Sequence, residues 1–129
     1  MNFIKPEFII WDKNIKSFLN NVSTITFGVD TDKCYFTDTM GFNYPIESNH
    51  TLYPWSGLTD SYGDKIYEGT ILQIKDTANA VVVWDKTSAQ FTLNPHNPYS
   101  DWDLYEIMYD HSGDIEVIGH INTHPELVD

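Results

Sequence analysis

The sequence predicts a mainly β fold with little helix. Its C-terminal half is expected to form a small SH3-like barrel, preceded by an N-terminal β-hairpin or strand extension. Residues 80–84 form a continuous run of Ala, Val and Trp, which is typical of a strand buried on both faces. The segments 70–75 and 90–93 alternate between polar and apolar residues, as half-buried strands do. Turn-forming residues separate the three segments, giving the meander that a small barrel needs.

The N-terminal part predicts strands joined by polar turns. Residues 3–11 are expected to form a strand. Residues 15–27 return as a second strand with an irregular middle, or else with a short helix over 15–21. An Asp-rich turn over 28–33 then leads into a strand over 34–37.

Two polar connections lie further along the chain. Residues 38–49 contain Gly41 and Pro45 and predict a long, mobile connection. Residues 94–101, with two prolines and two asparagines, predict a surface loop. The following segment, 101–109, is compatible with a helical turn or with a strand.

Residues 55–71 form a corner around which the remaining chain is organised. Asp60 and Gly63 favour a tight turn, because glycine adopts positive φ and aspartate bonds its own backbone. Gly57 and Gly69 stand beside large side chains, where a missing Cβ lets backbone or a ring approach closely. We interpret this segment as a structural corner, with a ligand loop as the alternative. The proposed structural motif comprises Gly57, Asp60, Gly63, Tyr67, Glu68 and Gly69.

The end of the chain predicts a last strand over 115–121 and a tail over 125–127 that docks back on the barrel. No linker or domain boundary is apparent. We therefore expect one domain over 1–129, with N-terminal strands and a loop over 1–55 and the barrel-like part over 56–129.

Composition limits the classes of partner. The net charge is -12, with seven lysines and no arginine, in a chain of 129 residues. Phosphate recognition draws on clustered Lys and Arg, so this balance argues against nucleic acid as a partner. It argues equally against an anionic membrane surface.

The N-terminus lacks the apolar core of a signal peptide, and no segment approaches transmembrane length. We therefore expect a cytoplasmic protein. Cys34 is the only cysteine and lies in an alternating stretch, where a buried and inert thiol is expected.

Candidate chemistry in the sequence is sparse. His120 and His124 are four residues apart, but Gly119 and Pro125 flank them and the setting predicts a strand and a tail instead of a helix. Carboxylate pairs occur at short spacing in turns, which favours solvated charges over general acid–base chemistry. We expect no catalytic residue, no metal ligand and no cofactor, with a metal-dependent enzyme as the alternative.

Aromatic residues are more abundant than a small core requires, and Trp and Tyr favour protein interfaces. Trp84 and Tyr67 are expected in the core. The candidate interface aromatics are Trp55, Tyr62, Tyr99 and Trp102. These residues predict a non-enzymatic protein–protein interaction module that can also self-associate through an edge strand. The alternative is an acidic nucleic-acid mimic that blocks a basic host protein.

Three segments together resemble the YopX-like proteins of bacteriophages and prophages. The corner contributes residues 57–63 and 66–69, the start contributes 8–13, and the end contributes 116–121 with 125–127. They occur in the right order and span nearly the whole chain. The sequence departs from the family pattern at Thr70, where Asp is usual, and at His120, where Asn is usual.

The resemblance implies a small β-barrel-type fold, SH3-like in its later half, in a phage accessory protein. It implies no established activity, catalytic residue or cofactor. The implied partner is a host or phage protein.

Overall fold

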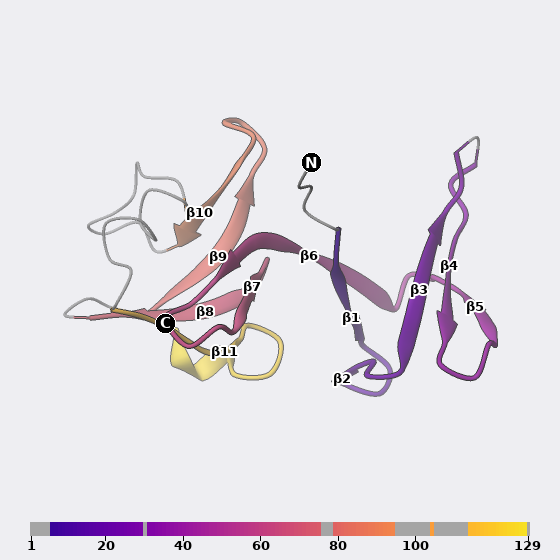
Figure 1. Cartoon of the computed structure of the whole chain (residues 1–129), viewed down its shortest axis with the longest axis horizontal. Coiled ribbons are helices and arrows are strands. Elements are labelled where there is room, and N and C mark those ends of the chain that lie inside the picture. The colour runs from indigo at the N-terminus through magenta and orange to yellow at the C-terminus, as the bar shows by residue number, and fades with distance from the viewer. Residues whose placement is uncertain (1–5, 30, 76–78, 95–103, 105–113, 129) are drawn as a thin grey trace. The chain divides into compact units, whose positions relative to one another are not determined.

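The computed structural model describes residues 6–29, 31–75, 79–94, 104 and 114–128. Within them the chain is mainly β, as predicted, with a single short 3-10 helix (Figure 1). Two compact units are present. The N-terminal unit is Ile9–Leu52, and the C-terminal unit combines Met1–Phe8 with Tyr53–Asp129. Strands β1 and β6 run from one unit into the other.

The first five strands belong to the N-terminal part of the chain, and the later ones build the C-terminal unit. The elements are β1 (Phe8–Asp12), β2 (Ser17–Phe18), β3 (Val22–Phe27), β4 (Cys34–Asp38), β5 (Asn43–Pro45), β6 (His50–Thr59), β7 (Lys65–Tyr67), β8 (Thr70–Ile74), β9 (Ala80–Asp85), β10 (Gln90–Asn94), β11 (Ile115–His120) and the 3-10 helix η1 (Pro125–Leu127).

A four-stranded antiparallel sheet in the order β10-β9-β8-β11 forms the body of the C-terminal unit. Figure 1 shows it curling, with β9 and β10 turning upward from β8 and β11. Its buried side chains form one apolar cluster, which excludes water and stabilises the unit. The cluster comprises Ile66, Leu72, Ile74, Ala80, Val82, Leu93, Leu104 and Ile115.

The strand buried on both faces is β8, whereas the sequence predicted β9. Ile71 and Leu72 face opposite sides of β8, and both are fully buried. On β9 Val81 and Val83 are only half-buried. Trp84, which we expected in the core, is 47% exposed. A run of valines predicts a strand but not whether one or both of its faces are buried, because β-branched side chains suit either case.

The N-terminal unit contains a three-stranded antiparallel sheet in the order β3-β4-β5. Residues 15–21 hold a turn and the short strand β2, so the alternative short helix there is wrong. The connection predicted over 38–49 contains β5. The Asp38 carboxylate stabilises the turn before that strand, because its Oδ1 accepts hydrogen bonds from the backbone N–H groups of Met40 and Phe42 at 3.0 Å each.

The turn between β7 and β8 packs directly against β11. Gly69 has φ +86°, and a Cβ added there would lie 2.4 Å from Nε2 of His120. The Gly69 N–H donates to the carbonyl of Val82 at 2.7 Å, and its carbonyl accepts from Ile121 N–H at 2.9 Å. Glycine is required here for both its conformation and its lack of a side chain.

We predict that Gly69→Ala destabilises the protein far more than Gly63→Ala. Gly63 has nearly the same φ, +88°, but no atom lies within 4 Å of an added Cβ. Gly63→Ala should lower the free energy of unfolding by about 1 kcal/mol through left-handed strain alone. Gly69→Ala adds a clash with a packed ring and should lower it by about 3 kcal/mol or more. Chemical denaturation of both variants measures the difference, and equal losses would contradict the close packing of His120.

Candidate functional site

The Asp60 carboxylate is the central polar group of the predicted corner. It is 6% exposed. Its Oδ1 accepts hydrogen bonds from the N–H groups of Tyr62 at 2.9 Å and Asp64 at 2.8 Å, and its Oδ2 accepts from Val117 N–H at 2.8 Å. The first two bonds shape the turn, and the third ties the turn to β11, 57 residues away in sequence. Burial opposes the charge, but backbone donors led by Val117 outweigh it, so the pKa of Asp60 is lowered.

The other residues of the proposed motif lie around this turn. Gly57 has φ +88° and sits where the pairing of β6 with β7 changes register. The Tyr67 N–H donates to Thr70 Oγ1 at 2.9 Å, and the Glu68 carbonyl contacts His120 Nε2 at 3.0 Å. These contacts lie within the corner or join it to β11, which fits a structural role for it.

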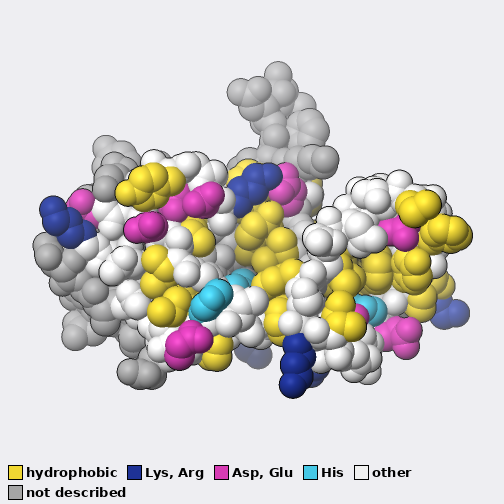
Figure 2. Space-filling model, turned by 90° about the horizontal axis from the view of Figure 1, so that it is seen from below, with side chains coloured by type: hydrophobic (Ala, Val, Ile, Leu, Met, Phe, Trp, Pro, Cys, Tyr) yellow, Lys and Arg dark blue, Asp and Glu magenta, His cyan; other side chains and the backbone are white. Residues whose placement is uncertain are grey.

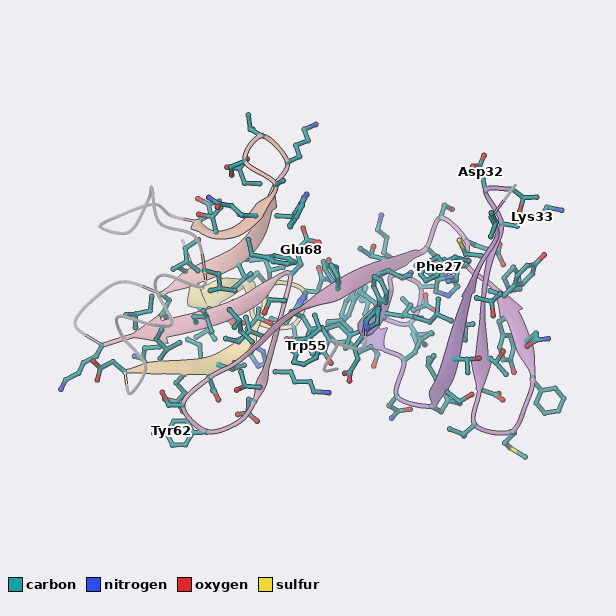
Figure 3. All side chains as sticks on the ribbon, turned by 45° about the horizontal axis from the view of Figure 1, so that its top comes forward. Phe27, Asp32, Lys33, Trp55, Tyr62 and Glu68 are labelled. Carbon is teal, nitrogen blue, oxygen red and sulfur yellow. The ribbon has the colours of Figure 1, made fainter. Side chains whose placement is uncertain are left out.

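The four candidate interface aromatics have different surroundings. Trp55 is half-buried; its Nε1 donates to the Leu58 carbonyl at 2.9 Å, and Lys65 Nζ lies 4.9 Å from its ring centroid. Tyr62 is 74% exposed, and Figure 3 shows it pointing outward from the β6–β7 turn. Tyr99 and Trp102 fall outside the described residues.

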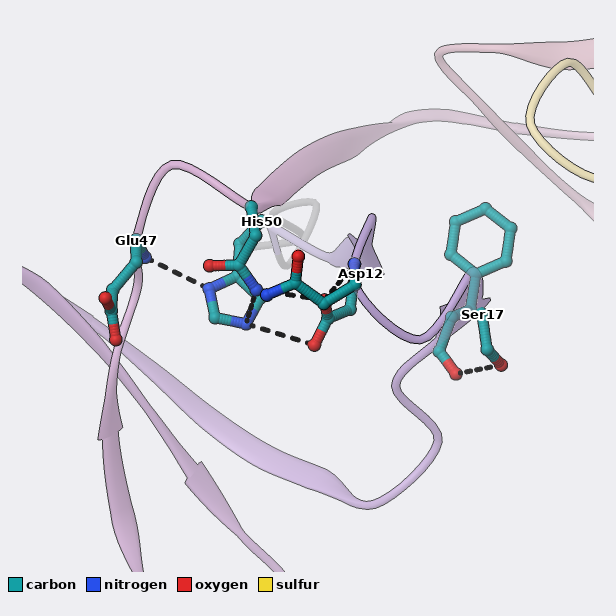
Figure 4. Close-up of polar contacts among 7 residues, drawn as sticks. Asp12, Ser17, Glu47 and His50 are labelled. Atoms are coloured by element: carbon teal, nitrogen blue, oxygen red, sulfur yellow. Dashed lines mark hydrogen bonds and ion pairs between the residues drawn. The ribbon is translucent and has the colours of Figure 1, made fainter.

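Asp12 and His50 form the most chemically suggestive pair of the N-terminal unit (Figure 4). His50 Nε2 lies 3.6 Å from Asp12 Oδ2, and His50 Nδ1 accepts from Glu47 N–H at 3.0 Å. Since Nδ1 is an acceptor, the proton of the neutral ring sits on Nε2 and faces Asp12. Asn49 Nδ2 donates to Asp12 Oδ1 at 2.9 Å, and this bond is the main cause of a lowered Asp12 pKa. The ring therefore holds a turn in place and offers no free basic nitrogen.

His120 is similarly committed. Its Nε2 bonds the Glu68 carbonyl at 3.0 Å, and its Nδ1 accepts from Asn122 N–H at 3.2 Å. Burial lowers the His120 pKa, so the ring is neutral. No group of three or more His, Cys, Asp or Glu side chains suited to a metal ion occurs in the described part of the chain.

Exposed hydrophobic side chains concentrate on the N-terminal unit. Of nine large hydrophobic residues exposed in the described segments, seven belong to this unit. Figure 2 shows hydrophobic side chains gathered over β4 and β5. The seven are Ile15, Phe27, Val29, Tyr35, Met40, Phe42 and Tyr44.

Charge is divided in the opposite way. Ile9–Leu52 carries five Asp and Glu and three Lys, a formal charge of −2. The rest of the chain carries fourteen Asp and Glu and four Lys, a formal charge of −10. The N-terminal unit is therefore nearly neutral where its hydrophobic side chains are exposed, which is typical of a surface that contacts protein.

The two edges of the β3-β4-β5 sheet differ. At the β5 edge Pro45 lacks an N–H, which blunts the edge. On β4 the Cys34 carbonyl and the Asp38 N–H form hydrogen bonds on the β5 side. Because successive residues of a strand direct their backbone groups to opposite sides, the N–H and carbonyl groups of Tyr35 and Thr37 point toward β3. Ile25 lies opposite Phe36, and its N–H and carbonyl therefore point away from the sheet. β3, with the sequence Val-Ser-Thr-Ile-Thr-Phe, contains no charge and no proline.

We call the outward side of β3 the β3 edge. Its residues Ser23, Thr24 and Thr26 are exposed, and Ile25 is half-buried. The sequence pattern predicts this strand but not its place at the edge of a sheet. The residue pattern of a strand does not show which strands lie beside it, so the edge position of β3 could not be predicted.

Comparison with known proteins gives a family from a sequence model and a fold from a solved structure. A family model described as "YopX protein" matches residues 7–129. The crystal structure of protein EF1440 from Enterococcus faecalis superimposes with a TM-score of 0.67 at 21% identity, covering 98% of this chain and all of that one. A search of curated proteins found no match. No helix among the described residues is long and apolar enough to cross a membrane.

We predict that Asp60→Asn lowers the free energy of unfolding by about 2 kcal/mol at pH 7. An asparagine oxygen can accept two of the three N–H bonds, but its amide N–H₂ cannot accept the third. The folded pKa of Asp60 lies below its unfolded value of about 3.9, so its stabilisation is present above that pH and is lost as the pH falls through the folded pKa. The gap between wild type and variant should therefore shrink below about pH 4.

Urea denaturation across this pH range measures the gap. Asp64→Asn is the matched control, because the exposed Asp64 contributes only its backbone N–H and carbonyl to the turn. It should change stability by less than about 0.5 kcal/mol. A gap for Asp60→Asn that stays constant into strong acid would contradict the role of the charged form.

Proposed function

We propose that this chain, which belongs to the YopX protein family, acts by protein–protein contact without catalysis, and that its N-terminal unit associates with a second copy of itself through the β3 edge. The observation that carries the proposal is the coincidence of exposed hydrophobic side chains, low charge and one unblocked sheet edge on the same 44-residue unit, Ile9–Leu52.

Electrostatics supports the choice of surface. Two copies of a chain with a net charge of -12 repel one another, so contact is least unfavourable where charge density is lowest. The N-terminal unit, at −2, meets that condition, whereas the C-terminal unit, at −10, does not. The β3 edge itself contains no charged residue.

The geometry of β3 suits pairing with its own copy. An antiparallel pair related by a two-fold axis through Ile25 would exchange two hydrogen bonds between the outward N–H and carbonyl groups of the two Ile25 residues. The two three-stranded sheets would then continue as one sheet of six strands.

The surroundings of two histidines, His50 and His120, support contact without catalysis. Both ring nitrogens of His120 are hydrogen-bonded within the protein, and His50 Nδ1 accepts from Glu47 N–H while its Nε2 lies 3.6 Å from Asp12 Oδ2. A general base needs a nitrogen that can reach a substrate proton, and neither ring offers one.

The biological setting follows from the family resemblance. We propose a phage or prophage accessory protein of the bacterial cytoplasm, with a host or phage protein as a further partner and an SH3-like topology in the curled sheet. A second candidate, an acidic nucleic-acid mimic, is favoured by the −10 charge of the C-terminal unit. It requires carboxylates spaced like phosphates along one face of that unit.

We predict that the protein sediments as a dimer at micromolar concentration and that Ile25→Pro makes it a monomer. Proline removes only an N–H that points away from the sheet, so no bond to β4 is lost. Ile25→Val keeps the N–H and the branched side chain and should remain dimeric. Sedimentation velocity over a concentration series measures the change, with far-UV circular dichroism to verify folding.

A disulfide provides the second measurement. Across the proposed two-fold axis the two Cα atoms of residue 25 would lie about 5.5 Å apart, which a disulfide can bridge. Ile25→Cys in a Cys34→Ser background should therefore form a covalent dimer on oxidation, whereas Tyr62→Cys, exposed on the C-terminal unit, should not. A wild-type monomer at all concentrations, or a dimer indifferent to Ile25→Pro, would refute the proposed pairing.

A further inference from the structure

A small pocket opens in the C-terminal unit, separate from the β3 edge. Its volume is about 230 Å³. Trp84 and Phe91 form one wall; they lie opposite each other on β9 and β10, with ring centroids 4.9 Å apart and planes at 71°. Leu58 and Leu104 add further apolar lining. We call this the Trp84 pocket.

The apolar lining of the pocket is continuous with the core. Leu104 is 2% exposed and belongs to the buried cluster, and Leu58 and Phe91 pack against that cluster. Trp84, by contrast, is 47% exposed and reaches solvent. Ser56 and Gln90 supply the polar groups of the lining. The pocket is thus a depression with an apolar lining and an aromatic side chain at its mouth.

Size limits the class of ligand. Pockets for drug-sized molecules and cofactors measure about 300–1,000 Å³. A volume of about 230 Å³ is too small for most of them and suits one large apolar side chain. Anchoring of a single side chain in such a pocket is how many protein interfaces gain most of their binding energy.

Side-chain hydrogen bonds close the turn of the hairpin that carries Trp84. Asp85, the next residue, accepts hydrogen bonds from Thr87 N–H and from Ser88 Oγ at 2.9 Å each. These bonds, with the Ser88 hydroxyl first, lower the pKa of Asp85, so it is a carboxylate at neutral pH. Asp85 pairs with Gln90 of the pocket lining, which brings its charge beside the pocket. Lys86 follows in the same turn, and the surrounding unit carries a formal charge of −10.

We propose that the Trp84 pocket binds one large apolar side chain of a basic peptide segment in a partner protein. The apolar side chain would fill the pocket, and flanking lysines or arginines would meet the acidic unit. The exposed ring of Trp84 can accept a cation over its face, as Trp55 does for Lys65 in this chain. This partner differs from the second copy that pairs at the β3 edge, and the two sites are tested separately.

A fluorescein-labelled nine-residue peptide with a central leucine and two lysines on each side, otherwise glycine and serine, is the probe. We expect saturable binding in fluorescence anisotropy at low salt. A peptide with central alanine should bind at least tenfold more weakly, and one with glutamates in place of lysines should not bind. Trp84→Ala should weaken binding of the leucine peptide at least tenfold, and Trp84→Tyr should weaken it less.

Tyr62→Ala is the matched control, because Tyr62 is an exposed aromatic of the same unit outside the pocket; it should bind the peptide as wild type does. Since Trp84 is half exposed, its replacement should leave the fold intact, and circular dichroism verifies this. Equal binding of the leucine and alanine peptides would show attraction by charge alone and overturn the proposal. Unchanged affinity of Trp84→Ala, or no binding of any peptide, would also overturn it. Ile25→Pro should bind the peptide normally, so failure of self-association and failure of this site give different results.

Discussion

The buried carboxylate of Asp60 is the contact on which the C-terminal unit depends. Asp60 is charged although it is only 6% exposed, and its three N–H donors offset the cost of burying that charge. Two donors come from its own turn and one from β11, so the same anion shapes a local bend and fastens the last strand to it. His120 makes the second fastening, with its ring packed against the bare Cα of Gly69. The corner is therefore fastened to β11 at two points, Val117 and His120.

The division of charge between the two units separates two kinds of contact. A nearly neutral surface with exposed hydrophobic side chains favours association with another molecule of the same charge. An acidic surface with an aromatic pocket favours a basic partner instead. In the two proposed contacts, the residues that would pair with a second copy and those that would bind a basic partner belong to different units.

Local chemistry was predictable from sequence, and long-range contacts were not. The turn at Asp60 and Gly63 follows from residue preferences, as does the strand after Gly69, whereas β6 and β7 on either side of the turn were expected as parts of the corner and not as strands. That Asp60 also bonds Val117, and that Gly69 faces His120, depends on residues about 50 positions apart. The strand β5 was missed because Pro45 and Gly41 favour a loop, whereas the Asp38 carboxylate organises a tight turn that starts a strand. Trp84 was expected in the core because its neighbours are apolar, but the face on which a strand residue lies depends on what covers the sheet.

Pro45 has a consequence for how large an assembly can grow. A sheet with two open edges adds copies without limit, which is how fibrils lengthen. In the N-terminal unit the edge strand β5 ends in a proline. Pairing through the other edge, β3, would leave neither molecule with an open β3 edge. In the proposed dimer, growth of this sheet would therefore stop at two copies.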